Sequence, residues 1–160
     1  MNPATDPGTD PTRPDIADRD DLDRVLRRFY RAAFADPLIG PHFTEVAALD
    51  LESHLPVITD FWESALLRGA AYRRNAYAPH LGLHRSRPLT AAHFGRWVQL
   101  WRAAVDGAHA GPVAERAKRQ AERIALSMLA RLDADEADRA GAAAGPSGGF
   151  VPLSALLLRT

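Results

Sequence analysis

His80 is the residue of this sequence whose type and surroundings indicate the most specific chemistry. It lies between Tyr77 and Leu83, in a short segment that also contains proline and glycine. A neutral imidazole is a common axial ligand of haem iron, which keeps two axial positions outside the porphyrin plane. If His80 takes one of these positions, the other stays open to a small gas molecule.

Two aromatic side chains could stabilise such a gas ligand by hydrogen bonding. Tyr30 carries an O–H group and Trp97 an indole N–H group, and both donors are attached to large apolar rings. Dioxygen that binds to iron becomes partly anionic, so donors that point at it in an apolar pocket stabilise it. Tyr30 and Trp97 are therefore the candidate ligand-stabilising residues.

His54 has a different candidate role. It precedes Ile58 by four residues and Phe61 by seven, so the three side chains share one face of a predicted helix. Ile58 and Phe61 would cover a porphyrin, whereas His54 lies nearer the helix start and could move between pocket and solvent. That placement is typical of a gate, or of a proton shuttle, since an imidazole titrates near neutral pH.

The aromatic residues also have a simpler explanation. Tryptophans at helical spacing are more often core residues than ligand contacts, and this applies to Trp62, Trp97 and Trp101. Phe29 and Tyr30, taken alone, are an ordinary core pair. A helical interaction module without haem, whose aromatic residues form only a core, therefore remains open at this point.

The remaining histidines raise further alternatives. His84 follows His80 by one helical turn and is a rival axial ligand, and the two could instead form a zinc-binding pair. The other three, His42, His93 and His109, are expected to be solvated or half-buried. Residue type alone does not decide between these possibilities.

The elements that must position these side chains are predicted to be helices. Apolar residues recur every three or four positions, and no alternation typical of a strand is long enough to predict one. The sequence therefore predicts an all-α domain. Its helices are expected at about 22–35, 51–67, 91–108 and 112–132, with a loop and one short helix carrying His80 at 68–89.

Local signals refine these boundaries. Asp20 or Asp21 could cap the first helix, and Thr90 could cap the helix that begins at residue 91. Pro56 falls inside the second helix, where proline is tolerated only near the start. We therefore expect its first regular turn to begin near Ser53.

Composition limits the possible functions. The chain has 160 residues, which suits one domain, and it balances 20 basic against 20 acidic residues, so it lacks the strong field that attracts nucleic acid. It contains no cysteine, which excludes disulfides, thiolate catalysis, iron–sulfur clusters and covalent haem attachment. No apolar stretch is long enough to span a membrane. The first residues are acidic and proline-rich, unlike a secretory signal, so the cytoplasm is the expected location. Arginine strongly outnumbers lysine, as in proteins encoded by GC-rich bacterial genomes.

The two ends of the chain differ from the middle. Residues 1–15 are rich in proline and polar side chains and are predicted to be a disordered tail, followed by the domain at 16–132. Residues 133–149 have the composition of a flexible linker. Residues 150–160 form an apolar C-terminal tail that could dock in a groove.

The order and spacing of these motifs resemble the truncated haemoglobins, most closely the third group of that family. The resemblance covers roughly residues 21–132. It is carried by Phe29-Tyr30, by His54 with Phe61-Trp62, by His80 before Leu-Gly-Leu, by Phe94 with Trp97, and by the final amphipathic helix. The fold that it implies is a shortened globin, in which helices pack two over two around a haem pocket.

The resemblance implies a role for each matched position. It makes His80 the proximal iron ligand of a non-covalent haem b, Tyr30 the distal tyrosine, Trp97 a donor to the bound ligand and His54 the mobile distal histidine. The residues implied to line or support the haem cavity are Phe29, Ile58, Phe61, Trp62 and Phe94. Four arginines that flank the proximal segment could pair with the haem propionates: Arg73, Arg74, Arg85 and Arg87.

Three functions are consistent with these features. The first is a globin that binds dioxygen, nitric oxide or carbon monoxide at iron held by His80. The second is a haem enzyme that oxidises nitric oxide or uses peroxide, with His54 moving protons and a separate reductase, because no dinucleotide-binding fingerprint is present. The third is the interaction module without haem, whose apolar tail binds a partner.

Overall fold

The computed structural model describes residues 12–67 and 75–143, and within these ranges the regular elements are all helical. Their order is α1 (Arg19–Ala35), the short π-helix η1 (His42–Val46), α2 (Leu51–Leu66), α3 (Tyr77–Ser86), α4 (Ala91–Asp106) and α5 (Pro112–Ala143). The predicted all-α class is confirmed. No helix of the described residues is both long enough and apolar enough to cross a membrane.

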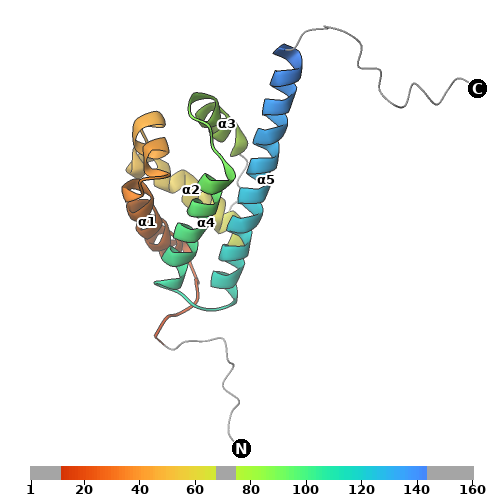
Figure 1. Cartoon of the computed structure of the whole chain (residues 1–160). Helices are drawn as coiled ribbons and strands as arrows, with labels where there is room; N and C mark the ends of the chain where they lie inside the picture. The colour runs from red at the N-terminus through yellow and green to blue at the C-terminus, as the bar shows by residue number, and fades with distance from the viewer. Residues whose placement is uncertain (1–11, 68–74, 144–160) are drawn as a thin grey trace, which may run out of the picture.

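The long helices pack as two pairs. α1 contacts α2, α4 contacts α5, and the pairs meet through α1–α4 and α2–α5 contacts. Figure 1 shows α5 along one side of the molecule with α4 beside it and α3 near its C-terminal half. This is the predicted two-over-two arrangement of helices.

Packing of apolar stripes fixes these helices. On α1 the buried residues Leu22, Val25, Leu26, Phe29, Tyr30 and Ala33 follow the three- and four-residue spacing of one helix face. They meet Trp62 from α2 and Trp101 from α4, both of which are fully buried. The indole rings of Trp62 and Trp101 stack with their centroids 4.2 Å apart, and the Trp101 Nε1–H donates to the carbonyl of Ala117 on α5.

Helix starts agree with the prediction at α4 and differ at α1 and α2. Thr90 caps α4 together with His93, as expected for the first of these residues. The cap of α1 is Asp18, whose carboxylate accepts the Asp21 N–H at 2.9 Å, so the expected caps Asp20 and Asp21 were wrong. Both lie inside the first turn, where acidic side chains favour the positive end of the helix dipole.

α2 begins at Leu51, before the start expected near Ser53. Pro56 is therefore the sixth helical residue, and it leaves the carbonyl of Glu52 without the usual N–H partner from four residues on. Both Pro56 and Glu52 are exposed, so that carbonyl can be solvated. The missing hydrogen bond destabilises the helix. Packing of its buried residues, which include Leu55 and Thr59, offsets this loss of free energy.

The domain also extends further than expected in both directions. α5 continues to Ala143, so residues 133–143 are helical where a flexible linker was expected. This segment is rich in alanine and contains no proline, and both properties favour helix. Residues 1–11 and 144–160, which include the expected apolar tail, lie outside the described residues.

Residues 12–15 are attached to the domain, although they were expected to belong to a disordered tail. The carboxylate of Asp15 accepts the backbone N–H groups of Val113 and Ala114, both at 2.8 Å, and so caps α5 from 98 and 99 residues away. Gly111 precedes this helix with φ +144°, and a Cβ there would lie 2.5 Å from the Asp15 carboxyl carbon. Glycine is therefore required for the close approach.

We predict that Asp15→Ala lowers the free energy of unfolding by about 1–2 kcal/mol, because it removes an N-cap carboxylate from the longest helix. Urea unfolding followed by circular dichroism measures this change. The matched control is Asp138→Ala, which removes an exposed carboxylate near the other end of the same helix and is expected to leave the midpoint unchanged. Equal midpoints for Asp15→Ala and the control would contradict the capping role.

Candidate functional site

A cavity of about 1150 Å³ lies between the two helix pairs. This volume is slightly above the range of about 300–1,000 Å³ found for most small-molecule pockets. Its lining is mainly apolar and aromatic and includes every cavity residue expected from the sequence, namely Phe29, Tyr30, His54, Ile58, Phe61, Trp62, His80, Phe94 and Trp97. Residues that are far apart in the sequence thus meet around one space.

His80 enters this cavity from α3. Asn75 starts that helix, since its side-chain oxygen accepts the N–H groups of Tyr77 and Ala78. The His80 Nδ1 lies 2.7 Å from the carbonyl oxygen of Ala76, one turn earlier, and as the N–H donor it would leave Nε2 as the ring nitrogen with a free lone pair. Histidines that bind a metal through one ring nitrogen commonly donate the N–H of the other to a backbone carbonyl, which fixes the orientation of the ring.

His84 is placed differently from His80. It is buried, its Nδ1 accepts the Leu89 N–H at 3.0 Å, and its Nε2 lies 2.9 Å from Glu136 Oε1. Both ring nitrogens therefore have partners, which makes His84 a poor axial ligand. In the described part of the chain no group of three or more histidine or acidic side chains could hold a metal ion, so nothing there completes the zinc pair that His80 and His84 could have begun.

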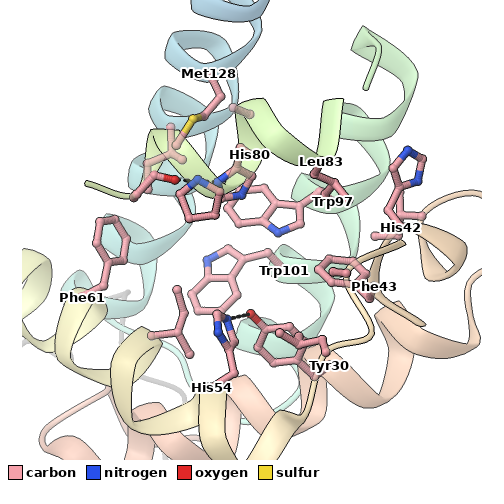
Figure 2. Close-up of a pocket in the computed structure, with 18 of the residues that line it drawn as sticks. Tyr30, His42, Phe43, His54, Phe61, His80, Leu83, Trp97, Trp101 and Met128 are labelled. Carbon is pink, nitrogen blue, oxygen red and sulfur yellow. Dashed lines mark hydrogen bonds between the residues drawn. The ribbon is translucent and has the colours of Figure 1, made fainter. Parts of the chain in front are cut away.

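Tyr30 and His54 form a hydrogen-bonded pair on the opposite side of the cavity from His80 (Figure 2). The Tyr30 Oη and His54 Nε2 atoms are 2.9 Å apart. Burial raises the pKa of Tyr30 far above its usual value, so this hydroxyl keeps its proton. Burial, and to a smaller extent His80, lowers the pKa of His54, which favours a neutral imidazole at neutral pH.

The tautomer of His54 decides what Tyr30 can do. If His54 carries its proton on Nε2, it donates to Tyr30 Oη, and the tyrosine proton is free to point into the cavity. If the proton is on Nδ1, Tyr30 donates to His54 instead. His54 can therefore control whether the Tyr30 hydroxyl is available to a ligand.

Trp97 forms one wall of the cavity. Its ring is parallel to that of Trp101, with centroids 6.4 Å apart, and it packs edge-on against Phe29. Figure 2 shows Trp97 beside His80, with Trp101 between them and the Tyr30–His54 pair. Trp101 uses its N–H in the core, as described above, whereas Trp97 is only half-buried and faces the cavity. Trp101 therefore has its N–H group engaged in helix packing, and Trp97 is the candidate for contact with a ligand.

The sequence interpretation missed several cavity residues. His42 is one of them: it was expected to be solvated or half-buried but is only 2% exposed, with its ring 4.7 Å from that of His93. Burial lowers its pKa, so it is neutral. His109 is also buried, and its Nδ1 contacts the carbonyl of Pro14.

Two of the four arginines that were expected to face the haem propionates lie away from the cavity. Arg85 pairs with Asp135 at 2.9 Å and Arg87 with Glu45 at 3.2 Å, and neither lines the cavity; Arg73 and Arg74 lie outside the described residues. The basic side chains that line it come from α5. They belong to a face that repeats every three or four residues and could have been found by that spacing: Gln120, Arg123, Ile124, Ser127, Met128 and Arg131.

α5 also holds the helix that carries His80. The Tyr77 hydroxyl donates to the Arg131 carbonyl at 3.1 Å, and the Arg131 guanidinium lies 5.5 Å from the centre of the Tyr77 ring. At the other end of α3, the pairs His84–Glu136 and Arg85–Asp135 bind the same stretch of α5. The part of α5 beyond the expected helix end therefore positions α3.

We predict that the double substitution Asp135→Ala, Glu136→Ala loosens α3 without unfolding the domain, because the core helices make no use of these carboxylates. The expected result is amide hydrogen exchange in α3 that is about threefold to tenfold faster, in line with partly exposed ion pairs. Asp133→Ala and Asp138→Ala together serve as the matched control. Identical exchange rates in the two double variants would contradict the positioning role.

Comparison with known proteins agrees with this architecture. No family model matches the chain, and a search of curated proteins also finds no match. Among solved structures, the chain is similar to the crystal structure of group III truncated hemoglobin from Campylobacter jejuni, with a TM-score of 0.66 and 20% sequence identity over 75% of this chain and 94% of that one. The chain therefore has the fold of a truncated haemoglobin, as the resemblance in its sequence implied.

Proposed function

We propose that this protein is a haem-binding globin that takes up dioxygen, and also nitric oxide or carbon monoxide. The observation that carries the proposal is the placement of His80: its Nδ1 faces the Ala76 carbonyl, and it lies across an aromatic-lined cavity from Tyr30 and His54. The lining is mainly apolar and aromatic, which suits a large flat apolar group with polar groups at its edge.

The residues present fit a non-covalent haem b. When bound, this group would supply iron with one open coordination position for a diatomic molecule. His80 would hold the iron through Nε2, and Phe61, Ile58 and Phe94 would exclude water from the macrocycle. Tyr30 and Trp97 would donate hydrogen bonds to a ligand, with His54 controlling the Tyr30 hydroxyl. A cytoplasmic location remains a prediction.

The absorption spectrum of the purified protein, before and after reconstitution with haemin, tests this proposal. We expect a strong Soret band and one haem per chain, measured as the pyridine haemochrome. A chain that takes up no haem under either condition would overturn the proposal and would favour the interaction module without haem.

An enzymatic function is a second candidate, which the Tyr30–His54 pair favours. A half-buried histidine with a lowered pKa can accept a proton from, or return one to, a reacting ligand through the Tyr30 hydroxyl. Use of peroxide would need this proton transfer. Oxidation of nitric oxide to nitrate would not, but it would need electrons from a separate reductase to return the iron to its ferrous state. Rapid mixing of the haem-loaded, dioxygen-equilibrated protein with nitric oxide, followed by nitrate assay, distinguishes turnover from simple binding.

A further inference from the structure

Arg123 and Arg131 are the arginines among the described residues that line the cavity, and both come from α5. Their partners are neutral groups. The Arg123 Nη2 donates to the side-chain oxygen of Gln120 at 2.8 Å, and the Arg131 guanidinium lies over the Tyr77 ring. Neither arginine has an ion pair with a carboxylate from the described part of the chain.

Other arginines of the described helices do have carboxylate partners. Arg27 is paired with Glu52, Arg85 with Asp135 and Arg87 with Glu45, so their charges are already balanced. The carboxylate that lines the cavity is Asp50, and it accepts a hydrogen bond from Ser53 at the start of α2. Two positive charges on one face of α5 are therefore left without a protein counter-charge at the edge of an apolar cavity.

A ligand that suits this arrangement is apolar over most of its surface and carries two carboxylates at one edge. Guanidinium groups bind carboxylates in a forked, charge-assisted geometry that lysine does not reproduce. Eight residues separate Arg123 from Arg131, or about 12 Å along a helix axis, and long arginine side chains can narrow this distance. The Gln120 amide and the Tyr77 ring would hold the two guanidinium groups in place before the ligand arrives.

We propose that Arg123 and Arg131 bind the two propionate carboxylates of the porphyrin. This inference rests on the proposed function, since it assigns further binding residues to the same cavity. It replaces Arg85 and Arg87, whose charges are balanced by Asp135 and Glu45, with two residues of α5 that line the cavity. In this proposal α5 both positions the helix that carries His80 and binds the carboxylate edge of the porphyrin.

The test compares haemin with haemin dimethyl ester, which has the same ring but no free carboxylates. Apoprotein is titrated with each porphyrin, and the Soret absorbance gives the two dissociation constants. For Arg123→Gln combined with Arg131→Gln, we expect affinity for haemin to fall by at least about tenfold, as for lost charge-assisted hydrogen bonds, while affinity for the ester stays within about twofold of the wild-type value. Arg119→Gln, on an exposed part of α5 that does not line the cavity, is the matched control.

The ester titration separates charge recognition from damage to the fold. A double variant whose affinity falls equally for haemin and for the ester, or falls for neither, contradicts this inference while the proposed function stands. Arg123→Lys with Arg131→Lys should restore only part of the haemin affinity, because lysine keeps the charge but not the fork. A wild-type protein that binds neither porphyrin would overturn the proposed function and this inference together.

Discussion

The His80→Ala protein is expected to fold normally and to lose stoichiometric haem binding. His80 is exposed toward the cavity and its hydrogen bond is to Ala76 in its own helix turn, so removing the ring leaves the core unchanged. Removing the ring also deletes the Nε2 that would hold the iron, and His84, one helical turn further on, is not a ready substitute. His84 has both nitrogens occupied, as described above.

Far-ultraviolet circular dichroism and the haem-to-protein ratio after gel filtration measure the two parts of this result. The matched control is His80→Gly with added free imidazole, which can enter the space left by the side chain and supply the missing ligand. We expect imidazole to restore a Soret band to that variant. A His80→Ala protein with one haem per chain and an unchanged spectrum would mean that the iron is held elsewhere.

The second large effect is expected from the distal donors. Replacing Tyr30 by Phe and Trp97 by Phe removes the O–H and N–H groups while keeping aromatic rings in the cavity wall. A hydrogen bond to a partly charged ligand contributes about 1.5 kcal/mol, or about tenfold in rate for each donor. We therefore expect dioxygen to dissociate about a hundredfold faster from the double variant.

Stopped-flow displacement of dioxygen by carbon monoxide measures these rates. Phe61→Leu is the matched control, since it changes an aromatic residue of the cavity that carries no donor. His54→Leu provides a further comparison, because it deletes the partner that competes for the Tyr30 hydroxyl. Off-rates for the Tyr30, Trp97 double variant that equal those of the control would exclude both donor roles.

The parts of this fold that follow from local sequence were predictable. The stripe from Leu22 to Ala33 and the Thr90 cap depend on residues within a few positions of one another, and the structure confirms both. The gathering of Tyr30, His54, His80 and Trp97 around one cavity required the family resemblance as well, because four residues on four helices share no local pattern.

Other features could not be predicted because their partners are distant in the sequence. The sequence places Asp15 in a polar tail. In the folded chain, the start of α5 places two backbone N–H groups beside its carboxylate, which accepts both. The composition of residues 133–143 predicts a solvated segment. Asp135 and Glu136 acquire ion-pair partners only because α3 packs against this part of α5. His42 is adjacent to Pro41 and Phe43 in a short segment, where nothing in its neighbours signals burial.

The tryptophan stack has a practical consequence for anyone who works with this protein. All three tryptophans of the chain, Trp62, Trp97 and Trp101, lie in one near-parallel column whose members all line the cavity. Their intrinsic emission therefore originates from a single place in the molecule. A coloured occupant of that space would quench the whole signal by energy transfer, so the chain contains its own optical sensor of cavity filling.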